Sequence, residues 1–331
     1  METTIKKTSD QPRQKNIAGM SMKGGKKDKF YTCLLEYYPD QERWFLKSLL
    51  QVKDLDDSGV GQDSDEAIRN WIEEKNLKKL VVDFPLSQPA CQECRLDCPG
   101  VSVCPDTTVV DVRNKIEGLI SQDARNNVKG PKEYERSRNE DDLYDKGRDI
   151  WALDSYQHLL SRSFKRRLKK GFTPYWNRPV DFWIWAFYYD QLLDVFNTSY
   201  DSFGNTSLMV ISRFFYLKRH FPSDLELFEG NILLTLLELM RAGILTKSQL
   251  QSLSDLEEGV EARKKVIKCI EEKLNIFIYE ADLDLVVKHP HAFDSFLLAI
   301  SGRSIQVNKC HELPPWALPA RCKLIVPNFK D

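Results

Sequence analysis

Three stretches rich in β-forming residues stand near the N-terminus, and their succession restricts the fold more than any other feature of the chain. They cover residues 17–22, 30–38 and 43–52 and are separated by turn-forming segments, one containing Gly25 and the other Pro39. In the third stretch successive residues belong to two faces of different character, which is the period of two that a β-strand has. The simplest structure for this succession is three antiparallel strands.

A helix and a fourth strand are expected next. Ala67, Ile68 and Trp71 recur at the spacing of one helical face, and the apolar run that follows them ends at Asp83. Pro85 comes directly afterwards and stops the strand, which leaves the carboxylate of Asp83 at the strand end. Ligands of open α/β sheets bind at the carboxyl ends of strands, so Asp83 is a candidate site residue; the alternative is a carboxylate that stabilises the turn.

The second half of the chain is rich in helical patterns. One predicted helix ends at Gly243, another begins with the capping pair Thr246 and Gln249, and a last one carries Phe293 on its buried face. A short strand that contains Glu229 is expected among them. The fold class that follows is α/β, with a mixed sheet and a helical C-terminal half.

The chain has 331 residues, which fits either two domains or one large α/β domain. We predict a disordered tail at residues 1–14, one domain at residues 15–308 and an irregular C-terminal segment at residues 309–331. The domain carries a cysteine-rich insertion at about residues 88–150, where the composition becomes more polar and charged. The sequence contains no internal repeat.

Charge and hydropathy exclude several classes of protein. Lys and Arg number 48 and Asp and Glu 49, so the net charge of −1 provides no overall attraction to nucleic acid or to anionic lipid. No apolar stretch reaches the roughly 18 residues of a membrane span, and the polar N-terminus lacks the apolar segment of a signal peptide. We therefore expect a cytoplasmic protein without membrane contact, in a reducing compartment where its eight cysteines do not form disulfides.

Four of the cysteines stand close together, at Cys91, Cys94, Cys98 and Cys104. We expect them to bind Zn²⁺ as a structural site, because four thiolates at short spacing can surround one tetrahedral ion. An iron–sulfur cluster uses the same ligands, and the remaining alternative is a loop with free thiols. A metal ion held by four cysteines would organise the insertion and take no part in catalysis.

A basic and aromatic stretch follows the insertion, with no acidic residue between Ser155 and Val180. Cations of such a stretch bind phosphates while rings such as those of Tyr175 and Trp176 stack on bases, a combination found in grooves for single-stranded nucleic acid. The alternative is an amphipathic helix whose aromatic residues belong to the core. The cations that we expect to contact nucleic acid are Arg162, Lys165, Arg166, Arg167, Lys169, Lys170 and Arg178.

Several motifs together resemble one family of proteins. The segments VVDFPLSQPACQECRLDCPGVSVC, FTPYWNRPVDFW and HPHAFDSFLLAI are similar to segments of the bacterial family named domain of unknown function 429, and the similarity runs from about Asn16 to Ile300. Its most specific part is the D-x-P-L motif that leads into the cysteines. The family is described as predicted nucleases with a ribonuclease-H-like fold, whose first elements are also three strands, a helix and a fourth strand.

The resemblance implies a site for two divalent cations, Mg²⁺ or Mn²⁺, held by carboxylates. Matched residue by residue, Asp83 stands at the end of the central strand, Asp294 in the first turn of the last helix, and Glu229 is a weaker third match. Where the family pattern has a carboxylate on the first strand, this chain has Ser21, and a hydroxyl is a poor ligand for Mg²⁺. Asp28 lies beyond the glycine turn and can replace that carboxylate in part.

Each of these assignments has a structural alternative. Asp294 favours a helix N-terminus through the helix macrodipole, and Glu229 fits a solvated strand end. His289 and His291 are candidate proton-transfer groups near the metal ions, but histidines in loops usually face solvent.

Two functions follow from the sequence. The first is a divalent-metal-dependent nuclease with Asp83, Asp294 and Glu229 as catalytic residues. The second is a non-catalytic nucleic-acid-binding or protein-interaction module of the same fold, in which Ser21 replaces the first carboxylate. A third, ranked last, is other phosphoryl chemistry within the wider actin-like and ribonuclease-H-like superfold, because a fold does not determine a function. The sequence lacks the glycine-rich motifs of nucleotide-binding loops and does not indicate an oligomeric state.

Overall fold

The structure of the chain is a computed structural model. The predicted tail, Asp28 and residues 130–150 of the predicted insertion lie outside the residues that it describes. The described residues are 15–22, 30–52, 64–129, 162–198, 208–255, 258–318 and 323–330.

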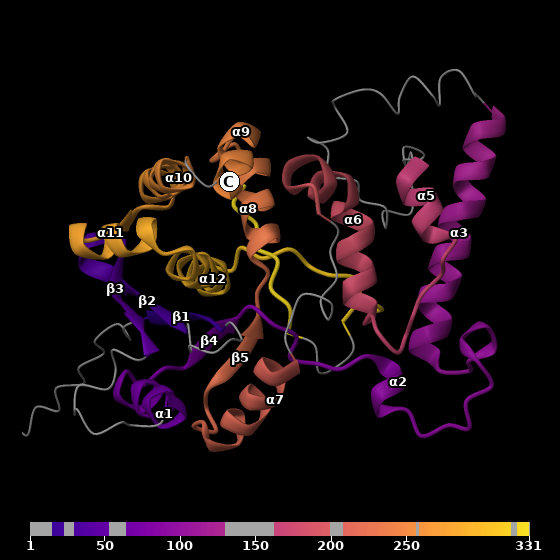
Figure 1. Ribbon diagram of the computed structural model, residues 1–331, viewed down its shortest axis with the longest axis horizontal. Helices are drawn as coiled ribbons and strands as arrows, with labels where there is room; N and C mark the ends of the chain where they lie inside the picture. The colour runs from indigo at the N-terminus through magenta and orange to yellow at the C-terminus, as the bar shows by residue number, and fades with distance from the viewer. Residues whose placement is uncertain are drawn as a thin grey trace, which may run out of the picture.

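The described strands form one mixed sheet with the order β5-β4-β1-β2-β3-β6 (Figure 1). β1, β2 and β3 are antiparallel in succession, while β4 runs parallel to β1, β5 parallel to β4, and β6 parallel to β3. The prediction of an α/β fold with three antiparallel strands that lead into parallel ones is confirmed. The strands are β1 (Lys15–Ser21), β2 (Tyr31–Tyr38), β3 (Arg43–Gln51), β4 (Lys79–Val82), β5 (Glu226–Glu229) and β6 (Ile276–Phe277).

Helices cover both faces of the sheet (Figure 1). One face carries α1 (Ser64–Glu74) and α7 (Leu208–Leu217), and its core includes Ala18. The opposite face has a larger core, which includes Ile17, because neighbouring residues of a strand point to opposite sides. The helices over this second face are α8 (Ile232–Arg241), α9 (Lys247–Gln251), α10 (Gly259–Leu274), α11 (Glu280–Lys288) and α12 (Pro290–Gln306).

The predicted helical C-terminal half is confirmed, together with several local signals. Gly243 has a φ of 70° directly after α8 and its C-cap, and the Thr246 side chain accepts a hydrogen bond from the backbone of Gln249. Phe293 is buried on α12. None of the described helices combines the length and the apolar character that crossing a membrane requires.

α12 packs directly on β1 because two glycines leave room for it. A Cβ atom on Gly19 would stand 2.2 Å from the carbonyl oxygen of Ser295, and one on Gly302 would stand 2.4 Å from the side chain of Ile17. Gly19 lies toward the end of β1 and Ile17 toward its beginning, so α12 runs antiparallel to β1. The first turns of α12 therefore lie at the end of the sheet where β1 and β4 finish.

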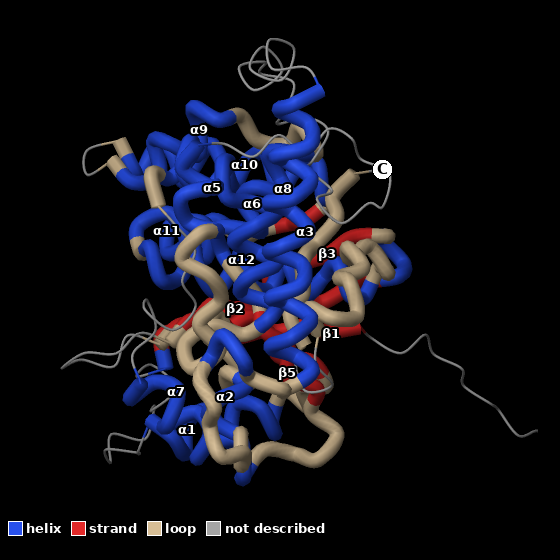
Figure 2. The backbone as a smooth tube through the Cα atoms, turned by 90° about the vertical axis from the view of Figure 1, so that its right-hand side faces the viewer, coloured by secondary structure: helices blue, strands red, loops and turns tan. Residues whose placement is uncertain are grey.

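A third hydrophobic cluster lies beside the layered part of the molecule (Figures 1 and 2). It joins α3 (Thr107–Lys129), α5 (Arg162–Leu168) and α6 (Pro179–Phe196), and it includes Val112 and Trp185. The described part of the predicted insertion thus packs against α5 and α6.

The C-terminal segment belongs to the core although it contains no helix among its described residues. Leu324, Ile325, Val326 and Phe329 are all buried. Leu324 also forms a parallel bridge with Glu229, so this segment lies beside the end of β5.

Candidate functional site

The ends of β1 and β4 bring Ser21 and Asp83 together. The two strands are parallel neighbours paired at Met20 and Val82, so the next residue of each comes to the same end of the sheet. The Ser21 hydroxyl donates to Asp83 Oδ2 at 2.9 Å, and the backbone N–H of Met22 donates to Oδ1 at 3.3 Å. Ser21 is fully buried and Asp83 is partly exposed. Ser21 therefore stands where the family pattern has its first carboxylate, and its hydroxyl donates a hydrogen bond to the second carboxylate, that of Asp83.

Glu229 ends the next strand, but its carboxylate is paired with a buried cation. Nη1 and Nη2 of Arg178 each donate to one oxygen of Glu229 at 2.7 Å, and the N–H of Leu86 donates at 3.2 Å. The same guanidinium donates to Asp181 at 2.7 and 3.0 Å and to the hydroxyl of Ser87 at 3.1 Å. The exposed fraction is 1% for Arg178 and 3% for Glu229. We call Arg178, Asp181, Glu229 and Ser87 the Arg178 cluster.

In the Arg178 cluster two carboxylates accept hydrogen bonds from the guanidinium and balance its charge. Burial alone would lower the pKa of Arg178, but the charges of Asp181 and Glu229 outweigh it and raise the pKa well above its ordinary value. A buried ion pair is tolerated when its hydrogen bonds are complete, as they are between these side chains. The cluster thereby fixes the start of α6, the end of β5 and the loop after β4 to one another.

This geometry argues against two roles predicted from the sequence. Both oxygens of Glu229 accept hydrogen bonds from Arg178, which competes with coordination of a metal ion, and a buried Arg178 has no surface to offer a phosphate. Part of this arrangement was readable in the sequence, because Asp181 follows Pro179 at the helix start and forms a capping box with Arg178. The partnership with Glu229 was not, because the two residues are 51 positions apart.

Asp294 lies near the start of α12 and therefore at the same end of the sheet as Ser21 and Asp83. Its Oδ2 atom is 3.6 Å from Nδ1 of His291, and both side chains are partly exposed. The ring of His289 instead stacks on Tyr31, with 5.9 Å between the ring centroids. Of the two predicted proton-transfer groups, His291 is the one placed beside a candidate carboxylate.

The carboxylates at this end of the sheet do not complete a metal site. Within the part of the chain that the structure describes, no group of three or more His, Cys, Asp or Glu side chains is arranged to hold a metal ion. Asp83 and Asp294 supply the anionic oxygens that Mg²⁺ or Mn²⁺ prefers, while Ser21 supplies a neutral one. The described residues therefore lack the anionic ligands that the two ions of the family pattern need.

The four clustered cysteines lie between β4 and α3, on and after α2 (Ala90–Glu93). Burial raises the pKa of the Cys91 thiol, and the nearby thiols of Cys104, Cys94 and Cys98 raise it further. All four are free thiols in this structure, and among the described residues they form no group arranged to hold a metal ion. They are near neighbours in space without being gathered around one point.

The cations of the basic stretch differ in their surroundings. Arg162 begins α5, and Lys165 forms an ion pair of 2.6 Å with Asp123 of α3. The guanidinium of Arg167 lies 5.9 Å from the ring of Trp185. The side chains that are exposed at the end of α5 are those of Arg166, Arg167, Lys169 and Lys170.

The turn between α5 and α6 presents two aromatic rings to solvent. Tyr175 is 57% exposed and Trp176 43% exposed in this aromatic turn, which covers residues 173–177. The carbonyl of Pro174 accepts a hydrogen bond of 3.1 Å from the N–H of Cys91, so the turn touches the cysteine segment. At its other end Arg178 holds the turn to β5. The exposed cations of α5, the two rings and the strand ends are thus linked in one region.

No family model, no curated protein and no solved structure matches the chain in the comparisons made. The resemblance drawn from the motifs therefore stays a prediction.

Proposed function

We propose that the chain is a nucleic-acid-binding protein with a ribonuclease-H-like fold. The order of the first five strands supports the fold: three antiparallel strands, then a strand beside the first and another beyond it, with a helix laid along the first strand. The helix placed on β1 is α12, which the family pattern also expects to carry a carboxylate. The C-terminal helices over the same face are additions to this arrangement.

The observation that carries the binding function is the aromatic turn. Tyr175 is 57% exposed and Trp176 43% exposed in the turn that follows exposed Lys169 and Lys170, and neighbouring exposed apolar side chains mark interaction surfaces. Rings stack on bases of any sequence, and lysines neutralise the phosphates between them. A single strand with unpaired bases is therefore the form of nucleic acid that this surface fits best.

Metal-dependent cleavage is the second candidate, and one observation favours it. Asp83 and Asp294 are both partly exposed at the end of the sheet to which the Arg178 cluster ties the aromatic turn. A strand held by the turn would pass near these carboxylates. The Ser21 hydroxyl and the engaged Glu229 leave this site with fewer anionic ligands than two-metal hydrolysis uses, so we rank cleavage second.

The binding function is tested by fluorescence anisotropy with labelled single-stranded DNA and RNA and the matching duplexes. We expect Tyr175→Ala to weaken single-strand binding about tenfold, because stacking contributes on the order of 1–3 kcal/mol per base. Tyr175→Phe keeps the ring and should bind like the unchanged protein. Equal binding by Tyr175→Ala and Tyr175→Phe would reject the stacking surface.

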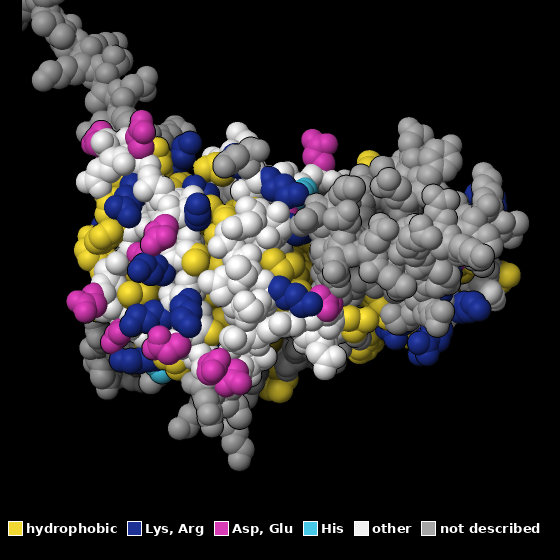
Figure 3. Space-filling view, turned by 90° about the horizontal axis from the view of Figure 1, so that it is seen from above, with side chains coloured by type: hydrophobic (Ala, Val, Ile, Leu, Met, Phe, Trp, Pro, Cys, Tyr) yellow, Lys and Arg dark blue, Asp and Glu magenta, His cyan; other side chains and the backbone are white. Residues whose placement is uncertain are grey.

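The phosphate contacts are tested through the salt dependence of the same binding. The double variant Lys169→Gln and Lys170→Gln should lower the slope of log affinity against log salt by about 1.4, because each single-strand phosphate contact contributes about 0.7. The matched control is Lys264→Gln with Lys265→Gln on α10, since both lysines are exposed. The face on the side of α9 and α10 mixes cations with carboxylates (Figure 3), so this control should leave the slope unchanged.

Cleavage is tested on the same substrates with Mg²⁺ or Mn²⁺. If the second candidate is right, Asp83→Asn and Asp294→Asn each abolish cleavage while they still bind the labelled strand. Salt-sensitive binding without metal-dependent cleavage establishes the binding function alone.

Zinc remains our proposal for the four cysteines, as a staple of the segment before α3. The short spacing of the four thiols supports it, and so does the backbone N–H of Leu96, which donates to Cys94 Sγ at 3.4 Å and would stabilise a thiolate there. Elemental analysis of protein purified without chelator should find about one zinc per chain. Cys98→Ser should lose that zinc and Cys269→Ser, on α10, should keep it.

A further inference from the structure

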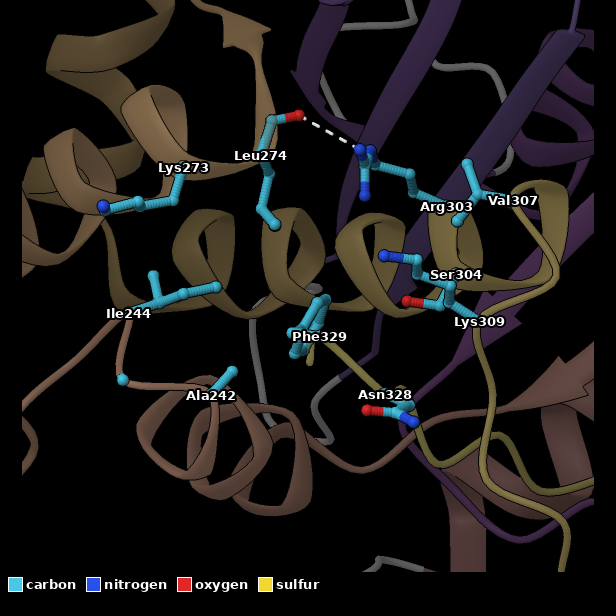
Figure 4. A pocket seen from close by; sticks show the side chains of 11 residues that line it. Ala242, Ile244, Lys273, Leu274, Arg303, Ser304, Val307, Lys309, Asn328 and Phe329 are labelled. Atoms are coloured by element: carbon cyan, nitrogen blue, oxygen red, sulfur yellow. Dashed lines mark hydrogen bonds between the residues drawn. The ribbon is translucent and has the colours of Figure 1, made fainter. Parts of the chain in front are cut away.

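A second site lies at the opposite end of the sheet from Ser21 and Asp83. A pocket of about 400 Å³ opens where α8, α10 and α12 end and the C-terminal segment passes them (Figure 4). Its lining includes Arg303 from the last turns of α12, whereas Asp294 lies in the first turns of the same helix. The volume falls in the range of sites for small molecules, about 300–1,000 Å³.

The charged side chains that line this pocket are all cations. Lys273, Arg303 and Lys309 belong to the lining, which contains no Asp or Glu. In Figure 4 the side chains of Arg303 and Lys309 lie on the same side of the view as Ser304, whereas the side chain of Lys273 extends away from them. The guanidinium of Arg303 donates to the carbonyl of Leu274 at 3.1 Å, and its Nε atom is buried without a hydrogen-bond partner. The charge balance of the pocket therefore favours an anion.

Ser304 provides an observation that does not depend on charge. Its side chain is 1% exposed, lines the pocket, and has no hydrogen-bond partner in the described structure. Two other buried serines of α12 bond to their own helix, Ser295 to Ala292 and Ser301 to Leu297. A buried hydroxyl without a partner is costly and uncommon, so Ser304 has an unused donor at the wall of the pocket.

The remaining lining contains the polar side chain of Asn328 and several apolar residues, among them Leu274 and Phe329, which are both buried. From these features we propose that the pocket binds a small organic anion, in which a phosphate or carboxylate group faces Arg303, Lys309 and Ser304 and an apolar body lies against Leu274 and Phe329. The site is separate from the strand-end site and does not rest on the nucleic-acid function.

The proposal is tested by calorimetric titration of the full chain at constant ionic strength with phenyl phosphate, benzoate, inorganic phosphate and benzyl alcohol. We expect phenyl phosphate or benzoate to bind at least about tenfold more tightly than inorganic phosphate and benzyl alcohol, because only they combine charge with an apolar body. The stronger of the two identifies which anionic group the site takes. If no probe binds, or benzyl alcohol binds as well as both anions, the proposal is overturned.

Variants then locate the site. Ser304→Ala and Lys309→Gln should each weaken binding of the better probe about fivefold or more, since each removes one hydrogen bond to a charged group. Lys268→Gln is the matched control, because Lys268 is an exposed lysine like Lys309 and does not line the pocket. Equal losses in Lys309→Gln and Lys268→Gln would show that the cations act only through general charge, and would overturn the proposal.

Discussion

Asp83 and Glu229 follow neighbouring parallel strands, yet the structure treats the two carboxylates differently. Glu229 is buried and accepts two hydrogen bonds from the guanidinium of Arg178. Asp83 is partly exposed and accepts hydrogen bonds from a hydroxyl and a backbone amide, both neutral donors. One carboxylate is therefore buried with its counter-charge, while the other lies near the surface.

Position at a strand end therefore does not by itself make a carboxylate a metal ligand. A metal ion competes with whatever already neutralises its ligands, and displacing Arg178 from Glu229 would leave a buried guanidinium with less compensation. The donors from Ser21 and Met22 to Asp83 are neutral, and its side chain is partly exposed. The comparison assigns Glu229 to stability and leaves Asp83 as the candidate for chemistry or binding.

The largest effect that we predict comes from removing the cation. Arg178→Met leaves the carboxylates of Glu229 and Asp181 buried without their partner, so the free energy of unfolding should fall by about 3–5 kcal/mol. Urea unfolding monitored by circular dichroism measures it. Arg219→Met, at an exposed arginine, should change stability by less than about 0.5 kcal/mol. A loss below about 1 kcal/mol in Arg178→Met would remove the distinction between the two strand ends.

The sequence predicted the elements of this comparison but not their contacts. Alternation and turn residues located β1 to β4 and placed Asp83 at a strand end, because those signals are local. β6 was missed, since its two residues carry no period, and the helix over Glu280–Lys288 was not predicted. The pairing of Arg178 with Glu229 depends on where β5 and α6 meet in space, which no local pattern encodes.

The site was predictable in the same uneven way. The replacement of a carboxylate by Ser21 was visible in the sequence, but that its hydroxyl bonds Asp83 required the parallel pairing of β1 with β4. The basic stretch was read as one surface, whereas Arg178 is buried and Lys165 is paired with Asp123. A run of basic residues in the sequence gives only the residue types. Burial in the folded chain determines which of these cations are accessible to a ligand.

A second prediction restores the missing carboxylate. Ser21→Asp places a second negative charge beside Asp83 in a buried position, so stability in chelator should fall by about 2 kcal/mol. A divalent ion that bridges both carboxylates should reverse the loss, and the thermal midpoint should rise with Mn²⁺ concentration. Ser21→Ala removes the hydroxyl without adding charge and serves as the control, with a smaller response to Mn²⁺. No response of Ser21→Asp to Mn²⁺ would show that this strand end does not accommodate a metal ion.

The smallest predicted effect on stability belongs to Asp83 itself. In Asp83→Asn the amide oxygen can accept from the N–H of Met22 while the NH₂ group donates to the hydroxyl oxygen of Ser21, so the variant should lose about 1 kcal/mol or less. Glu229→Gln loses one charge of the Arg178 cluster and should cost about 3 kcal/mol in the same urea titration. Equal losses in the two variants would mean that Asp83 is as structural as Glu229. If Asp83→Asn loses little stability and also abolishes the rise of the thermal midpoint with Mn²⁺, the Asp83 carboxylate binds the ion and is not required for stability.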